Sequence, residues 1–152
     1  MVLMGERNWT LQALHLACAV ARQQGTIIHL VWMMPVQYTG WIGTPLGNSS
    51  FSSQEYADFM AYRETAEDYG VELCLCQMQY HTLHEAIAEA AEHLDASLVF
   101  ATLPHMTFNL WRKYLLRRLR RQLEIQGSQL YTLEPHQSTK NWVPAVSLPS
   151  SK

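Results

Sequence analysis

Cysteine and histidine pairs are the parts of this sequence that come nearest to a metal site. Cys74 and Cys76 lie two residues apart, so on a strand their side chains would share one face. His81 and His84 lie three residues apart, which places them on one face of a helix. A zinc site needs further ligands at matching spacing, and no second pair follows either of these. The sequence therefore favours packed side chains over metal ligands at all these positions.

Patterns that would support covalent catalysis are missing from the sequence. There is no Gly-x-Ser-x-Gly motif, and no pair of carboxylates marks a site. His29, which lies within a long apolar run, is favoured as a core histidine with a satisfied ring. The sequence therefore predicts a binding or assembly protein that is not an enzyme and needs no cofactor.

The strongest charge feature is a basic segment over residues 109–126. It carries six of the chain's eleven lysines and arginines: Arg112, Lys113, Arg117, Arg118, Arg120 and Arg121. Leucines recur through it at helical spacing, which predicts an amphipathic helix. Such a helix can dock on anionic lipid or on nucleic acid. The leucine stripe is needed to cover a sheet, however, so a solvated basic face is the favoured interpretation and docking the alternative.

Length and composition predict one domain. The 152 residues are 48% hydrophobic and 16% charged, and the net charge of −2 gives no general attraction to nucleic acid or acidic lipid. No run is long and apolar enough to span a bilayer, and the first residues lack the order of a secretion signal. Three cysteines form no paired framework, which fits a reducing compartment. We expect a cytoplasmic protein with a domain over 1–134 and a C-terminal tail over 135–152.

Turn formers and helix caps divide the chain into elements. A long loop is expected over 37–53, where glycine and serine are frequent. Asn8 is the expected N-cap of the first helix, and Gly25 its expected C-terminal residue. Thr82 followed by Glu85 predicts a capping box on the third helix.

Strand and helix patterns alternate along the chain. The expected strands cover 2–4, 26–34, 71–78, 97–103 and 128–134, and the expected helices cover 8–24, 53–69, 82–94 and 109–126. This order predicts an α/β, Rossmann-like fold of three layers, with a doubly wound five-stranded parallel sheet and helices on both faces. Ligands of such sheets bind outside the carboxyl ends of the strands, here near Gly5 and Thr102.

Three segments carry a resemblance to a known family. They are the Ala-Leu-His-Leu-Ala run at 13–17, the Ile-His-Leu-Val run at 28–31 and the Leu-Asp-Ala-Ser-Leu-Val-Phe run at 94–100. Over roughly residues 2–134 the chain resembles the universal stress protein family. The resemblance implies the strand order 3-2-1-4-5, a part in stress response and a dimer made through the last strand.

Members of that family that bind ATP carry an aspartate after the first strand and a Gly-x2-Gly-x9-Gly-Ser/Thr loop. Here the aspartate position falls on Gly5, next to Glu6. The loop positions fall on Ala101, Pro104, Tyr114 and Leu115. Glycines let backbone amides approach phosphate, proline has no amide hydrogen to donate, and a tyrosine would fill the phosphate position. The chain thus resembles a divergent member whose nucleotide pocket has degenerated.

Two uses of this pocket stay open beside docking by the basic helix. One is a non-catalytic module that acts through assembly or by sensing a small ligand. In the other, a nucleotide such as ATP or AMP, or another anionic ligand, binds with Glu6 in place of the aspartate and with Arg112 and Lys113 in place of the glycine loop. The candidate site therefore comprises Gly5, Glu6, Thr102, Arg112 and Lys113.

The last expected strand offers a sheet edge to a second chain. Its unpaired backbone groups and apolar side chains are a template for pairing. The residues concerned are Gln129, Leu130, Tyr131, Thr132 and Leu133. We therefore expect a homodimer through this edge.

Overall fold

The computed structural model describes residues 1–36, 52–103 and 109–133, which form five strands alternating with four helices. The strands are β1 (Val2–Leu3), β2 (Ile28–Pro35), β3 (Leu73–Tyr80), β4 (Leu98–Phe100) and β5 (Gln129–Tyr131). The helices are α1 (Arg7–Gln24), α2 (Ser53–Asp68), α3 (Leu83–His93) and α4 (Asn109–Ile125). Residues 37–51 of the loop expected over 37–53, and the tail over 135–152, lie outside the described residues, whereas Ser52 is the N-cap and Ser53 the first residue of α2.

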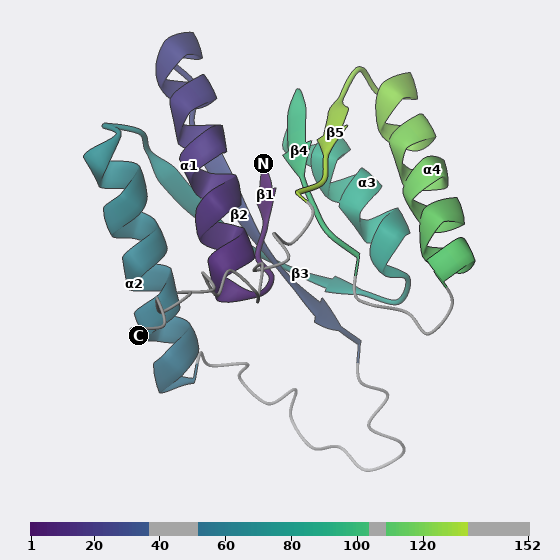
Figure 1. Ribbon diagram of the computed structural model, residues 1–152, viewed down its shortest axis with the longest axis horizontal. Helices are drawn as coiled ribbons and strands as arrows, with labels where there is room; N and C mark the ends of the chain where they lie inside the picture. Colours follow the sequence, from purple (N-terminus) through teal and green to yellow (C-terminus); the bar gives the residue numbers. More distant parts are fainter. Residues whose placement is uncertain (37–51, 104–108, 134–152) are drawn as a thin grey trace, which may run out of the picture.

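All strand pairs are parallel, and the sheet order is β3-β2-β1-β4-β5 (Figure 1). The predicted doubly wound fold is therefore confirmed. The strand order reverses between β1 and β4, because β2 and β3 are added on one side of β1, whereas β4 and β5 lie on the other side. Such a switch point leaves room for a ligand at the carboxyl ends of the strands.

Two hydrophobic clusters lie on the two faces of the sheet. One packs α1 and α2 against one face and includes Val2, whereas the other packs α3 and α4 and includes Leu3. Neighbouring residues of a strand point to opposite faces, so β1 contributes one buried side chain to each cluster. The helices accordingly pair as α1 with α2 and α3 with α4 (Figure 1).

The helix caps differ from those expected. Glu6, not Asn8, is the N-cap of α1, because its carboxylate accepts hydrogen bonds from the backbone amides of Asn8 and Trp9. Thr82 stands at the N-cap of α3 but makes no side-chain cap bond, so that capping box is wrong. Gly25 ends α1 in the left-handed conformation, as predicted.

A capping box that the sequence reasoning did not identify begins α2. The Ser52 hydroxyl accepts from the Glu55 amide at 3.2 Å, and the Glu55 carboxylate accepts from the Ser52 amide at 2.8 Å. These bonds to Ser52 hold the pKa of Glu55 below its usual value.

The last strand is shorter than predicted. β5 ends at Tyr131, so Thr132 and Leu133 lie beyond it. The carbonyl oxygen of Leu133 accepts a hydrogen bond from the Trp9 indole at 3.1 Å, which draws this segment inward over α1. Only Gln129, Leu130 and Tyr131 therefore remain as a strand edge.

Candidate functional site

A cleft of about 430 Å³ lies at the carboxyl ends of β1 to β4. Most of its lining is apolar: Leu3, Met4, Trp9, Met33, Tyr80, Leu83 and Leu103. The remaining lining residues are Gly5, Glu6, Thr102 and Arg112. An apolar cleft of this size with a few convergent polar groups is the usual form of a small-molecule site.

The turn from β1 into α1 forms one wall of the cleft. The Gly5 amide donates to the Thr10 hydroxyl at 3.0 Å, and that hydroxyl donates to the Glu6 carbonyl oxygen at 3.0 Å. A Cβ atom on Gly5 would lie 3.7 Å from Trp9 Cε3 and 3.8 Å from Thr102 Cγ2, which are ordinary contact distances. The space beside Gly5 would therefore admit a Cβ atom, so the approach of the two cleft walls at this point does not require a glycine.

Glu6 makes this wall negatively charged and occupies backbone amides at the start of α1. Its two carboxylate oxygens accept from the amides of Asn8 at 3.1 Å and Trp9 at 3.2 Å. The N-terminus of a helix ordinarily attracts anions through such amides. Because the Glu6 carboxylate already occupies them and adds negative charge, this end of α1 is closed to a phosphate group.

Arg112 is the positive group of the cleft. It enters from the first turn of α4, half-buried, and its Nε atom is fully buried. Within the described part of the chain, this Nε has no hydrogen-bond partner. A buried donor without a partner costs roughly 1–3 kcal/mol, so a ligand acceptor at this point would recover a penalty that the free protein carries.

Thr102 supplies an aliphatic hydroxyl to the lining of the cleft. It lies two residues beyond the end of β4, and its Oγ1 makes only a 3.5 Å contact with the Leu103 carbonyl oxygen. At that length the bond is marginal, so the hydroxyl is free to turn toward a ligand.

Four of the five predicted site residues line this one cleft: Gly5, Glu6, Thr102 and Arg112. Lys113 does not; its side chain is exposed on α4. Tyr114 is also turned away from the cleft and is exposed, so the expectation that its ring fills the phosphate position is wrong. Leu115 is buried between α4 and the sheet, and Pro104 lies outside the described residues.

Sequence reasoning missed the apolar lining, in particular Trp9, Met33, Tyr80 and Leu83. A usable signal was present, because Met33 and Tyr80 stand near the carboxyl ends of their strands, where this class of sheet binds ligands. Trp9 is buried in the first turn of α1, where its indole ties the helix to the segment after β5.

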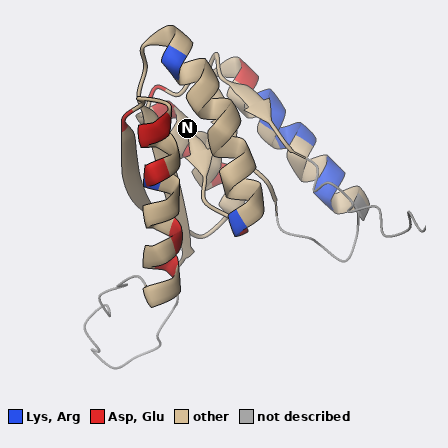
Figure 2. Cartoon of the chain, turned by 60° about the vertical axis from the view of Figure 1, so that its left-hand side comes forward, with Lys and Arg blue, Asp and Glu red and all other residues tan. Residues whose placement is uncertain are grey.

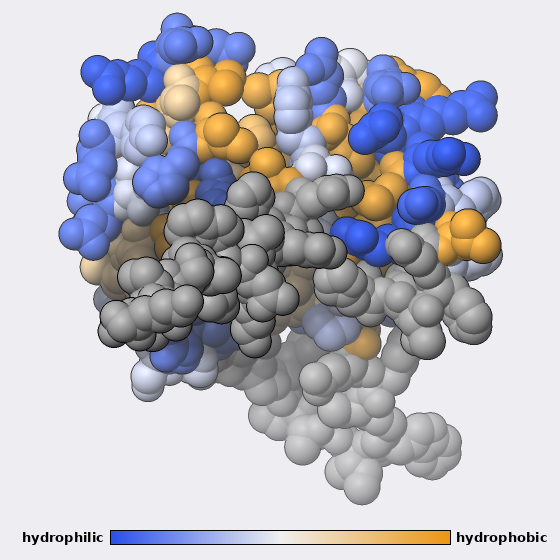
Figure 3. Space-filling view, in the orientation of Figure 1, coloured by the Kyte–Doolittle hydropathy of each residue, from blue (hydrophilic) through white to orange (hydrophobic). Residues whose placement is uncertain are grey.

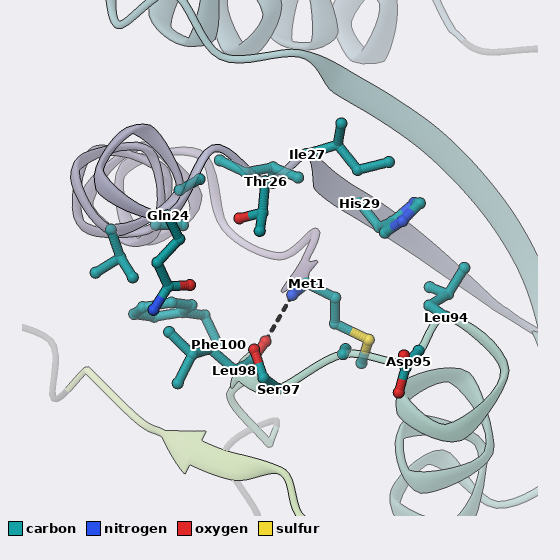
Figure 4. Close-up of a pocket in the computed structure, with 15 residues that line it drawn as sticks. Met1, Gln24, Thr26, Ile27, His29, Leu94, Asp95, Ser97, Leu98 and Phe100 are labelled. Atoms are coloured by element: carbon teal, nitrogen blue, oxygen red, sulfur yellow. Dashed lines mark hydrogen bonds between the residues drawn. The ribbon is translucent and has the colours of Figure 1, made fainter.

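A second, smaller cavity lies at the opposite, amino ends of the strands (Figure 4). Its volume is about 170 Å³, and the Met1 amino nitrogen donates across it to the Leu98 carbonyl oxygen at 2.6 Å. Small-molecule sites generally occupy roughly 300–1,000 Å³, so this cavity is the weaker candidate.

The cysteine and histidine pairs do not assemble a reactive centre among the described residues. Burial raises the pKa of Cys18 to about 11 and also raises the pKa of Cys76. His29 Nδ1 lies 3.7 Å from Cys76 Sγ, and the pKa of His29 is lowered by burial and, to a smaller extent, by the Met1 amino group in its protonated form. This pair is therefore neutral at pH 7. Within the described ranges no three histidine, cysteine or acidic residues are grouped as a metal site.

Comparison with known proteins places the fold. No protein-family model matches the chain, and no curated protein matches it significantly. A solved universal stress protein in complex with cAMP matches with a TM-score of 0.58 and 12% identity, over 88% of this chain and 95% of that one. The fold is similar to that of a universal stress protein. A universal stress protein family member from Burkholderia pseudomallei also matches, with a TM-score of 0.48 and 16% identity, over 87% of this chain and 93% of that one.

Proposed function

We propose that this protein is a non-catalytic binding module whose carboxyl-end cleft takes a small ligand with an apolar or aromatic body and a single anionic group. The unpartnered, buried Nε of Arg112 in an apolar cleft carries this proposal. Trp9, Met4 and Met33 line the apolar part of the cleft, where the ring of the ligand would lie. Arg112 and Thr102 would meet its anionic end. A hydrogen bond to a charged partner contributes roughly 1.5–3 kcal/mol, enough to select such a ligand.

A triphosphate is disfavoured in the same cleft. The closed amino end of α1 and the negative charge of Glu6 oppose a highly charged chain, and no glycine occurs at 101–126 to bring amides to phosphates. A nucleotide with one phosphate charge remains the second candidate, supported by the cAMP held in a solved protein of similar fold. In that case Glu6 accepts from a ribose hydroxyl through lone pairs that the cap bonds leave open.

Catalysis has no support from the described groups. The buried Cys18 thiol and the half-buried Cys76 thiol have raised pKa values, so neither is a thiolate nucleophile at neutral pH. Among the described residues that line the cleft there is a single carboxylate, Glu6, which is engaged in capping α1. Sensing or assembly, as in a stress-response module, fits these residues better than bond cleavage.

Calorimetric titration of the full chain tests the ligand proposal. The probes are cAMP, AMP and magnesium ATP, each at low and at physiological ionic strength. We expect cAMP, whose phosphate carries a single negative charge, to bind, and ATP to bind weakly or not at all. Arg112→Gln should weaken binding by about 10- to 100-fold, whereas Arg117→Gln, on the outer face of α4, should leave it unchanged. Equal affinity in Arg112→Gln, or ATP as the tightest ligand, would contradict the proposal.

We further propose a homodimer through β5. In the described structure β5 pairs only with β4, so its outer edge from Gln129 to Tyr131 is open, and Tyr131 is exposed there. A three-residue edge is short, so the dimer also needs side-chain contacts. Sedimentation equilibrium should show a dimer at micromolar concentration that Leu130→Pro dissociates, because proline removes a pairing amide. A monomer in the unaltered protein would rule the dimer out.

A further inference from the structure

The outer face of α4 combines exposed apolar side chains with arginines. Leu110 is 83% exposed, Ile125 78%, Trp111 58% and Tyr114 54%. Residues 110, 114, 121 and 125 follow helical spacing, so these side chains form one stripe along the helix. The Trp111 and Tyr114 rings lie together, with centroids 5.6 Å apart. The surface over α4 alternates between hydrophobic and strongly hydrophilic (Figure 3).

This stripe is separate from the one that holds α4 on the sheet. Leu115, Leu119 and Leu123 are buried in the cluster shared with α3. The inner apolar stripe of α4 packs in the core, whereas the outer stripe is exposed and packs against no other element in the described part of the chain. Docking through the outer stripe requires no rearrangement of the core.

The arginines of the outer face are largely uncompensated. Arg118 contacts Glu85 at 3.5 Å, but none of the described carboxylates lies within ion-pair distance of Lys113, Arg117, Arg120 or Arg121. With Glu124 as its one acid, α4 carries six positive and one negative charge, a net charge of +5.

The densest acidic charge lies on the other side of the molecule, although α3, which packs beside α4, carries the three acids Glu85, Glu89 and Glu92. Helix α2 holds five acids and one arginine, a net charge of −4, and packs on the opposite face of the sheet (Figure 2). The resulting dipole turns α4 toward any anionic surface and α2 away from it.

The side chains of the face decide what kind of partner fits. Single-stranded RNA would use Trp111 and Tyr114 for stacking, but it offers nothing apolar to Leu110 and Ile125. A second copy docked face to face would bring the same arginines together. An anionic lipid surface satisfies all three groups: phosphates for the arginines, the headgroup boundary for the two aromatic rings, and acyl chains for the aliphatic ends.

We propose that α4 is a membrane-docking helix that lies in the plane of an anionic lipid surface. None of the helices in the described ranges is long and apolar enough to cross a bilayer. Binding is therefore peripheral and depends on salt. Arg112 lines the cleft from the side of α4 that faces the sheet, opposite the outer face that docks. Docking therefore leaves the ligand site accessible.

Vesicle co-sedimentation of the full chain tests this proposal. The vesicles contain phosphatidylcholine alone or an equal mixture with phosphatidylglycerol, at low and physiological ionic strength. We expect partition only onto the acidic vesicles, weakening with salt. Each arginine near such a surface contributes a factor of about five, so Arg117→Gln with Arg121→Gln should weaken partition by about 25-fold. Leu110→Ser with Ile125→Ser should weaken it at least about tenfold.

The matched control lies on α1, across the sheet. Leu16→Ser with Arg22→Gln removes one exposed leucine and one exposed arginine there and should leave partition unchanged. In addition, brominated lipid should quench the tryptophan emission of the unaltered chain more than that of Trp111→Phe.

Three outcomes would overturn the proposal. The first is no partition onto acidic vesicles at low salt, and the second is a loss of partition in the α1 control equal to that in the α4 variants. The third is that the chain binds single-stranded RNA but not vesicles, and that the same α4 variants abolish this RNA binding. The last would assign the face to nucleic acid.

Discussion

Arg112→Met is expected to stabilise the free protein while it removes ligand binding. Arg112 buries its Nε in an apolar cleft, where none of the described residues accepts from it. Methionine keeps an unbranched stem of similar length beside Met4 and Met33 but carries no donor. The substitution therefore removes an unsatisfied group without opening a cavity.

The magnitude follows from the penalty for a buried donor without a partner. That penalty is roughly 1–3 kcal/mol, and Arg112 as a whole residue is only half-buried, so we expect a gain of about 1 kcal/mol in the free energy of unfolding. The stability gained by the variant equals the stability that the unaltered protein loses by keeping an unpaired donor at its ligand site.

Urea denaturation monitored by circular dichroism measures the difference. The control is Arg117→Met on the outer face of α4, where a surface substitution should change the unfolding free energy by less than about 0.5 kcal/mol. A loss of 1 kcal/mol or more in Arg112→Met would show that the arginine holds the cleft together. No change would show that water already satisfies Nε. Either result would refute the reasoning.

Three other substitutions test the structure around the cleft and the core. Glu6→Ala removes the N-cap of α1 and should cost about 1 kcal/mol in urea denaturation, and an unchanged midpoint would contradict the cap. Leu119→Ala, fully buried under α4, should cost about 2–5 kcal/mol, and a cost below 1 kcal/mol would mean that α4 is loosely packed. Burial lowers the pKa of His29 below its ordinary 6.5, so the unfolded chain binds its proton more readily. Burial also lowers the pKa of the Met1 amino group from 8.0 to about 6, so stability should begin to fall below about pH 8. The His29 contribution adds to this fall only below about pH 6.5, and His29→Gln should flatten that lower part of the profile. An identical pH profile in the variant would exclude His29 as the cause.

The fold was predictable because its signals are local and repeated. Apolar runs closed by Pro35 and Gly25 separated strands from helices, and their alternation left few arrangements for a parallel sheet. The caps were less predictable. Asn8 and Thr82 are good capping residue types, but the actual cap depends on where the chain leaves the strand, and after β1 that point is Glu6.

The site was predictable in position and only partly in composition. Gly5 and Thr102 each lie two residues beyond the end of a strand, β1 and β4 respectively, so the rule for carboxyl ends finds them. Arg112 lines the cleft and Lys113 does not, because adjacent residues on a helix point about 100° apart and the sequence alone did not fix the rotation of α4. Tyr80 was missed because β3 runs two residues past its expected end at 78.

Mapping the ligand site on the full chain by amide chemical shifts tests the central claim most directly. During titration with the tightest-binding monoanionic nucleotide, the amides of Gly5 and Thr102 should shift most. Those of Thr26 and Ser97, at the amino-end cavity, should stay in place. Saturable shifts at Thr26 and Ser97 without shifts at Gly5 and Thr102 would contradict the assignment of the carboxyl-end cleft as the binding site.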